Sequence, residues 1–99
     1  MPVMFDEVVE KVTAAKRQVE ADVDASPVLV AVVGEFHAKL AKAQKRATDG
    51  VPGRDAVVEL EQAGDSAKVA AEADAGVSSD ARGSVLAAHL AICKLKAGA

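Results

Sequence analysis

The side chains best suited to chemistry lie near the end of the chain, where Cys93 follows His89 by four residues. On a helix this spacing places both on one face, where a nitrogen and a sulfur could bind one metal ion. A structural zinc site needs four ligands, however, and the only other soft donor is His37. Arg82 and Lys96 stand seven residues before and after His89, and their charges oppose cation binding. We interpret the pair as a surface or boundary histidine beside a buried structural thiol, and predict no metal site.

The same two residues could form a cysteine–histidine catalytic dyad. Such a dyad needs a thiolate exposed in a cleft, a third group that orients the base, and donors for an oxyanion. Cys93 instead falls among Leu86 and Leu90 at helical spacing, where a free thiol behaves as a small apolar side chain. His37 flanks an apolar helical face and is interpreted as a partly buried, hydrogen-bonded histidine. We predict that the protein is not an enzyme and uses no cofactor.

Other motifs for metal or phosphate binding are missing from the sequence. A carboxylate-bridged di-metal bundle needs a glutamate followed three residues later by a histidine, but Glu35 and His37 are two residues apart and point to different faces. Gly50 and Gly53 are typical of a turn and not of a phosphate-binding loop. The acidic residues of the third predicted helix are interpreted as solvated charges: Glu59, Glu61, Asp65, Glu72 and Asp74.

Four basic residues lie close together near the middle of the chain and form a basic stripe: Lys39, Lys42, Lys45 and Arg46. It could contact phosphates or an acidic protein surface, but solvation and the negative end of the helix dipole already explain these residues. No aromatic side chain interleaves with them to stack a base, and the net charge of −3 disfavours nonspecific attraction to nucleic acid. A helix-turn-helix protein needs a basic recognition helix, but the third predicted helix is acidic and the fourth is apolar, which argues against this class of DNA-binding protein. A small regulator that contacts nucleic acid or an acidic partner is therefore the alternative hypothesis.

The run of six apolar residues from Val28 to Val33 is the segment on which the fold depends. It could be a buried strand, but no second segment offers a comparable pairing partner. Ser26 as an N-cap and Pro27 in the first turn indicate the start of a helix. We predict a helix over 27–47, with its core face at Leu29, Val32, Val33, Phe36, Leu40, Ala43 and Ala47.

Three further helices are predicted around this one. Residues 3–23 have an apolar face at Phe5, Val8, Val9, Val12, Ala15, Val19 and Val23. A third helix begins at Pro52 or Asp55 and ends near residue 75, with Gly64 as a possible break. Its inward stripe is predicted at Ala56, Leu60, Ala63, Ala67, Ala70 and Ala71. A fourth covers 80–97, with Ser78 or Ser79 as N-cap. No internal repeat is apparent, so we predict one all-α domain over 1–99, an up-down bundle of four helices, or of three if the third is broken.

Composition limits the location and the core of this domain. A chain of 99 residues without tryptophan or tyrosine builds a thin core that oligomerisation would support. A single cysteine excludes an intramolecular disulfide and suits a reducing compartment. The N-terminus lacks a basic flank, and no apolar run approaches the roughly 20 residues that span a bilayer. We expect a cytoplasmic protein with no signal peptide and no membrane segment.

The second and fourth predicted helices carry more apolar surface than one neighbour each can cover. We therefore predict a non-catalytic interaction or assembly module that binds a protein partner or forms a homo-oligomer. The residues predicted to contact the partner are Val30, Gly34, Ala38, Lys39, Ala41, Lys42, Arg46, Leu86, Leu90, Ile92 and Leu95.

Overall fold

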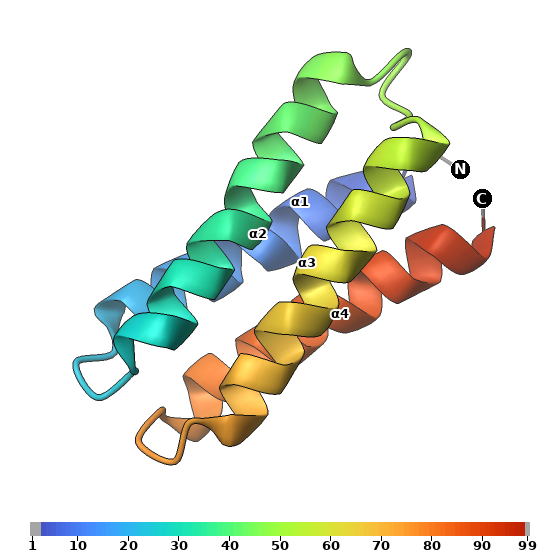
Figure 1. Ribbon diagram of the computed structural model, residues 1–99. Helices are drawn as coiled ribbons and strands as arrows, with labels where there is room; N and C mark the ends of the chain where they lie inside the picture. Colours follow the sequence, from blue (N-terminus) through green and yellow to red (C-terminus); the bar gives the residue numbers. More distant parts are fainter. Residues whose placement is uncertain (1–2, 99) are drawn as a thin grey trace.

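The computed structural model describes residues 3–98, which form four α-helices: α1 (Val3–Ala21), α2 (Pro27–Arg46), α3 (Arg54–Ala73) and α4 (Ser79–Gly98). Successive helices run in opposite directions, and α2 and α3 lie side by side in front of α1 and α4 (Figure 1). The prediction of an all-α up-down bundle of four helices is confirmed. Within the described residues, no helix combines the length and the apolar character that crossing a membrane requires.

Serine caps fix where α2 and α4 begin. The Ser26 hydroxyl accepts a hydrogen bond from the Leu29 amide at 3.1 Å, and Pro27 occupies the first turn of α2. The Ser78 hydroxyl accepts one from the Ala81 amide, also at 3.1 Å. The helix predicted over 27–47 is therefore confirmed, and the alternative strand over 28–33 is wrong.

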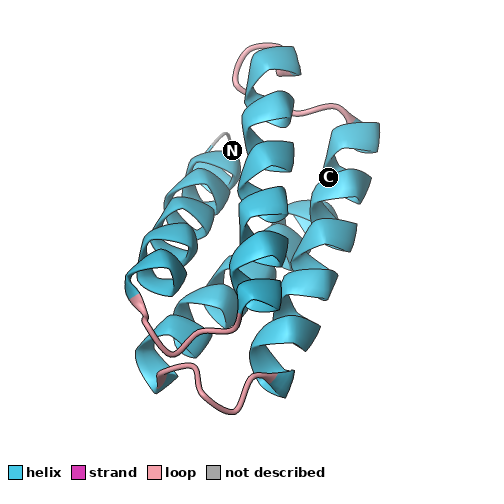
Figure 2. Cartoon of the chain, turned by 60° about the vertical axis from the view of Figure 1, so that its left-hand side comes forward, coloured by secondary structure: helices cyan, strands magenta, loops and turns pink. Residues whose placement is uncertain are grey.

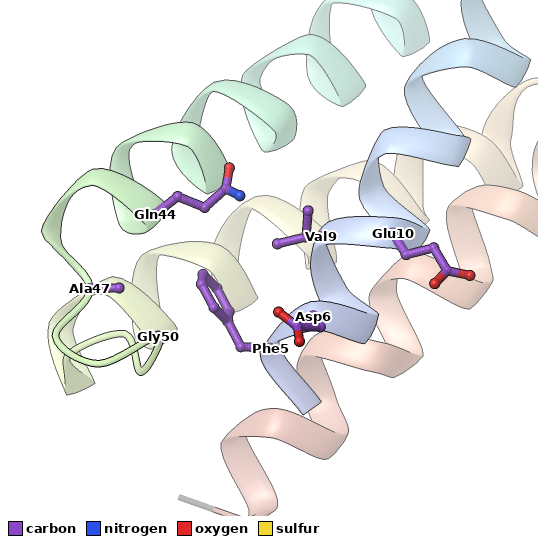
Figure 3. A pocket seen from close by; sticks show the side chains of 7 residues that line it. All are labelled: Phe5, Asp6, Val9, Glu10, Gln44, Ala47 and Gly50. Carbon is purple, nitrogen blue, oxygen red and sulfur yellow. The ribbon is translucent and has the colours of Figure 1, made fainter. Parts of the chain in front are cut away.

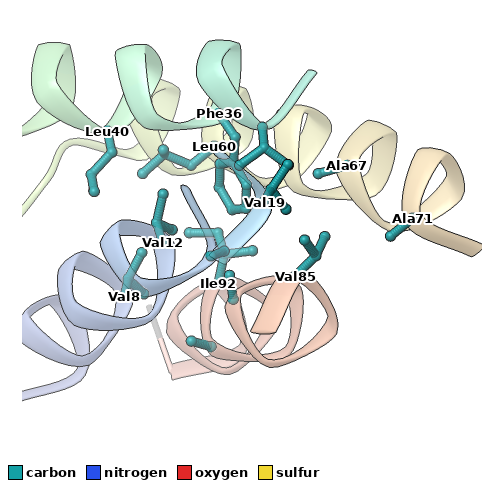
Figure 4. Packing of buried hydrophobic residues seen from close by; sticks show 14 of the residues in the cluster. Val8, Val12, Val19, Phe36, Leu40, Leu60, Ala67, Ala71, Val85 and Ile92 are labelled. Carbon is teal, nitrogen blue, oxygen red and sulfur yellow. The ribbon is translucent and has the colours of Figure 1, made fainter. Parts of the chain in front are cut away.

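The core lies between the two helix pairs and receives side chains from all four helices (Figure 4). The predicted core face of α1 is confirmed for Phe5, Val8, Val12, Ala15 and Val19, which are all buried. Val23 was expected on the same face but is 95% exposed. That expectation is wrong because α1 ends at Ala21 and the chain turns at Asp22, whose carboxylate accepts the Asp24 amide.

Helix α3 runs without interruption through Gly64, so the prediction of one helix is confirmed. Gly64 is buried where α3 meets the core, and a β-carbon there would lie 3.2 Å from both Ile92 Cγ2 and Phe36 Cζ. The glycine is a point of close helix packing and not a break. The inward face is rotated slightly from the predicted one, because Val57 is buried while Ala56, Ala63 and Ala70 are partly buried.

The two helical hairpins of the bundle are repeats of one another, which the sequence analysis did not find. An offset of 52 residues carries the end of α1 at Ala21 onto the end of α3 at Ala73, and the start of α2 at Pro27 onto the start of α4 at Ser79. The same offset carries all five buried residues of α1 onto the five buried residues of α3: Val57, Leu60, Gly64, Ala67 and Ala71. Four of the five buried residues of α2 likewise fall on buried residues of α4, namely Ala81, Val85, Ala88 and Ile92. The bundle therefore has an approximate internal two-fold symmetry.

The turns that close the two hairpins meet at one end of the molecule (Figures 1 and 2) and bind each other reciprocally. The Asp22 carboxylate accepts the Ser78 amide at 2.7 Å, and the Asp74 carboxylate accepts the Ser26 amide at 2.7 Å. These backbone donors hold the pKa of both carboxyl groups below the ordinary value of 3.8. Each hydrogen bond ties one hairpin to the N-cap of the other, so the symmetry extends to polar contacts.

Candidate interaction surface

His89 and Cys93 lie in a polar contact between α3 and α4, and their geometry does not activate the thiol. His89 Nε2 is 2.7 Å from Asp65 Oδ1, while Cys93 Sγ is 3.6 Å from the same Nε2 and 3.9 Å from Nδ1. In a nucleophilic triad the acid and the thiol use different ring nitrogens. Here the nearer nitrogen is already bound by the carboxylate, so the imidazole is not placed to take the thiol proton.

The surroundings of Cys93 also favour the neutral thiol. Burial raises its pKa, and the carboxylates of Glu61 and Asp65 raise it further. Among the described residues, no group of three or more His, Cys, Asp or Glu side chains is arranged to hold a metal ion. The arrangement supports packing and helix pairing in this region.

Arg82, His89 and Lys96, the polar line of α4, join α4 to α3 along its length. Lys96 Nζ bonds Glu61 Oε1 at 2.8 Å, which raises the pKa of Lys96. Arg82 donates to the backbone carbonyls of Ala71 at 3.2 Å and Asp74 at 2.8 Å, near the end of α3. The acidic residues in and directly after α3 were interpreted as solvated charges. That was wrong for four of them, which pair with groups of other elements: Glu59, Glu61, Asp65 and Asp74.

The basic stripe of α2 is also partly engaged within the molecule. Lys39 Nζ is 3.8 Å from both Glu35 Oε1 and Glu59 Oε1, and Lys42 Nζ is 4.0 Å from Glu59 Oε1. Glu59 comes from α3, so these contacts link the two helices at their exposed edge. The stripe is thus less available to an external acidic group than its sequence indicates.

A groove of about 460 Å³ opens between the start of α1 and the end of α2 (Figure 3). Phe5 and Val9 from α1 and Gln44 from α2 line it (Figure 3). Phe5 itself is only 5% exposed. The groove therefore offers little apolar surface to a partner, and its floor belongs to the core.

A second groove, of about 480 Å³, lies between α2 and α3. This α2/α3 groove is lined by Val28, Val32, Asp65, Ser66, Val69, Ala70 and Ala73. Val28 and Val69 line it from separate helices, and each is 65% exposed. Large aliphatic side chains this exposed and this close together expose an apolar patch to water.

The internal symmetry supplies a comparison surface within the same molecule. Under the 52-residue offset, Val28 and Val32 of α2 correspond to Asp80 and Ser84 of α4, and Val69 of α3 corresponds to Arg17 of α1. The pair α1 and α4 packs in the same way as α2 and α3, yet its corresponding face, which we name the α1/α4 face, carries these polar residues. The fold therefore does not require valine at positions 28 and 69, whereas Val32 also packs against the core.

The predicted contact residues fall into three groups in the structure. Ile92 is completely buried, so its prediction as a surface contact is wrong: it points into the core that all four helices share. Val30 and Leu95 are partly buried against the core, and Lys39 and Lys42 pair within the molecule. The remaining predicted residues keep exposed or half-exposed surface: Gly34, Ala38, Ala41, Arg46, Leu86 and Leu90.

Sequence reasoning missed Val28, Val32 and Val69 as contact residues. Val28 lies outside the predicted core face of its helix, and Val69 lies on the outer side of α3. Val32 was assigned to the core, against which it is partly buried, but it also lines the groove. The available signal was the pair of valines outside any core stripe. Only the structure shows that the two lie against the same groove.

Comparison with known proteins gives no further guidance: no protein-family model, no curated protein and no solved structure matches the chain.

Proposed function

We propose that this protein is a non-catalytic interaction and assembly module that binds a protein surface in its α2/α3 groove. The observation that carries the proposal is the contrast between the two symmetry-related faces. Val28, Val32 and Val69 stand where the α1/α4 face has Asp80, Ser84 and Arg17. Val32 is partly buried and packs against the core, but Val28 and Val69 are each 65% exposed. Exposed valines cost solubility, and a bound partner is the simplest reason for these two.

The same contrast provides the variant that tests the proposal. In the groove variant, Val28→Asp, Val32→Ser and Val69→Arg replace the valines with the residues of the α1/α4 face. Val28 lies in the first turn of α2, where an aspartate complements the helix dipole, as Asp80 does in α4. We expect this variant to fold with unchanged helicity and to lose partner binding.

A photocrosslinking amino acid at position 28 or 69 identifies what covers the groove in the cell that makes the protein. Position 51 is the matched control, because Val51 is 56% exposed and lies outside the groove. We expect protein crosslinks from positions 28 and 69 and none from position 51. The crosslinks from position 28 should disappear when Val32→Ser and Val69→Arg are added, and those from position 69 when Val28→Asp and Val32→Ser are added. Equal or no crosslinking from all three positions would refute the proposal.

The single thiol suits a reducing compartment, so we place the module in the cytoplasm as part of the proposal.

The second candidate is a regulator that contacts nucleic acid or an acidic partner through Lys45 and Arg46. For these two residues, no carboxylate of the described side chains lies within 4 Å. A salt-dependent interaction with a nucleic acid duplex or single strand, abolished by Lys45→Glu with Arg46→Glu, would support it.

A further inference from the structure

We propose that the occupant of the α2/α3 groove is a second copy of this chain, which inserts the exposed face of its α4 around Leu90. This inference rests on the proposed function, because it names the partner of the same groove. A second copy can fill the groove only if the molecule exposes another apolar surface with charges opposite to those of the groove, and α4 provides such a surface.

The outer face of α4 carries leucines that the fold does not need. Leu90 is 55% exposed, and Leu86 one turn earlier is half-buried. Under the 52-residue offset they correspond to Ala38 and Gly34 on α2, where a β-carbon added at Gly34 would meet no atom within 4 Å. Small residues satisfy the same positions in the other hairpin, so Leu86 and Leu90 form a second apolar feature that packing does not explain. We name this pair the α4 knob.

The charges beside the groove and the knob are opposite. Asp65 lines the groove from α3; it is 60% exposed and lies 2.7 Å from His89 Nε2. Glu35 lies outside the lining residues, one turn beyond Val32; it is 64% exposed and lies 3.8 Å from Lys39 Nζ. Beside the knob, Lys94 lies four residues after Leu90, is exposed, and has no carboxylate of the described side chains within 4 Å. A knob with a lysine at its edge therefore matches a groove with carboxylates at its edge.

Groove-to-groove pairing of two copies is disfavoured by the same charges. A two-fold axis through the apolar part of the groove would bring carboxylates of one copy towards carboxylates of the other, and like charges across an interface oppose association. The contact between groove and knob joins two different surfaces instead. Each added copy then leaves one groove and one knob free, so the assembly is a ring or an open chain of copies.

Mixing two variants in an analytical ultracentrifuge tests this arrangement directly. The groove variant keeps its knob, and a knob variant, Leu86→Ala with Leu90→Ala, keeps its groove. We expect the average mass of the unchanged chain to rise with concentration, and the dissociation constant of each variant alone to increase about tenfold or more. An equimolar mixture of the two variants should form a heterodimer that grows no further, because only one intact groove meets one intact knob. Val51→Gln is the control and should associate like the unchanged chain.

A charge exchange tests the register of the contact. Lys94→Glu should weaken association, and adding Glu35→Lys to the same chain should restore it, because every contact then joins the exchanged charges. Circular dichroism before each run confirms that the variants are folded, and both positions are exposed, so folding should not change.

Two results would overturn the inference. One is an unchanged chain that remains a monomer at concentrations near one millimolar; the other is a mixture of the two variants that associates no better than either alone. If the chain is monomeric while positions 28 and 69 crosslink a different protein, the second copy is excluded and the groove remains a docking site. If the chain is monomeric and these positions crosslink nothing, the proposed function falls as well.

Discussion

Exchanging one core pair for its symmetry equivalent should cost clearly less stability than the sum of the two single changes. Phe36 of α2 lies over Gly64 of α3, with Phe36 Cζ 3.2 Å from the position of an added β-carbon. The equivalent pair in the other half is Ala88 of α4 and Val12 of α1, which are both completely buried. The first interface thus combines a large side chain with a glycine, and the second combines two side chains of smaller size. The double variant Phe36→Ala with Gly64→Val makes the first interface resemble the second.

The single changes should be severe. Phe36 is completely buried, and truncating such a phenylalanine to alanine costs about 3–5 kcal/mol in free energy of unfolding. Gly64→Val forces new atoms against Phe36 and Ile92, which costs about 1–3 kcal/mol, offset by less than about 1 kcal/mol of helix propensity. If the two were independent, their sum would be about 4–7 kcal/mol, which is comparable with the whole stability of a small domain. In the double variant the valine enters the space that the ring leaves, so we expect a total loss of about 2–4 kcal/mol and a coupling energy near the upper end of the usual range, about 2–3 kcal/mol.

Urea unfolding followed by circular dichroism measures these values, since the chain has no tryptophan or tyrosine to report by fluorescence. Repeating the measurements with Val51→Gln added to each chain gives a second cycle that should show the same coupling. Additive losses, or a double variant less stable than both single variants, would refute the idea that the two interfaces are interchangeable in packing.

Three shorter predictions follow from exposure and pKa. Asp22→Asn and Asp74→Asn should lower the melting temperature at neutral pH, because each carboxylate accepts two backbone amides and a carboxamide oxygen can replace only one oxygen. Folding lowers the pKa of both carboxyl groups, so their contribution is present above the unfolded value of 3.8 and is lost as the pH falls through the folded pKa. The difference in melting temperature should therefore shrink as the solution is acidified below pH 3.8. Cys93 should react with iodoacetamide more slowly than the same chain in denaturant at pH 8, roughly, because burial raises its pKa; equal rates would contradict this. Val23→Gln should leave the melting temperature unchanged, whereas Val19→Gln should prevent folding or lower it sharply, as their exposures of 95% and 1% require.

Local signals were sufficient to predict the helices and most of the core. Ser26 and Pro27 mark the start of α2 in the sequence, and the period of apolar residues identifies the buried faces of α1 and α2. Such signals could not give the end of α1, because Val23 continues the apolar period past the residue where the chain turns. They also left α3 open to two interpretations, since a glycine that weakens an isolated helix is required here by Phe36 and Ile92.

The candidate site was harder to predict, because it depends on which surplus apolar residues meet. The sequence indicated too much apolar surface on α2 and α4, and part of it is indeed sealed: Ile92 enters the core and Leu95 packs against it. Leu90 remains exposed as predicted. The partner of Val28, by contrast, is Val69 on α3, and a pairing between helices that are distant in sequence has no local signature.

The repeat escaped sequence analysis because the two halves solve the same packing problem with different residues. Phe36 and Gly64 meet between α2 and α3, and the equivalent pair between α4 and α1 is Ala88 and Val12. The summed side-chain volume of each pair is similar, while the residues differ. The residues that remain identical are those whose hydrogen bonds no apolar side chain can make, namely the aspartates and serines of the two turns. Where equivalent positions differ and both are exposed, neither packing nor capping accounts for the difference. Val28 against Asp80 and Leu90 against Ala38 are such positions, and the bound partner that we propose would account for the larger apolar side chain.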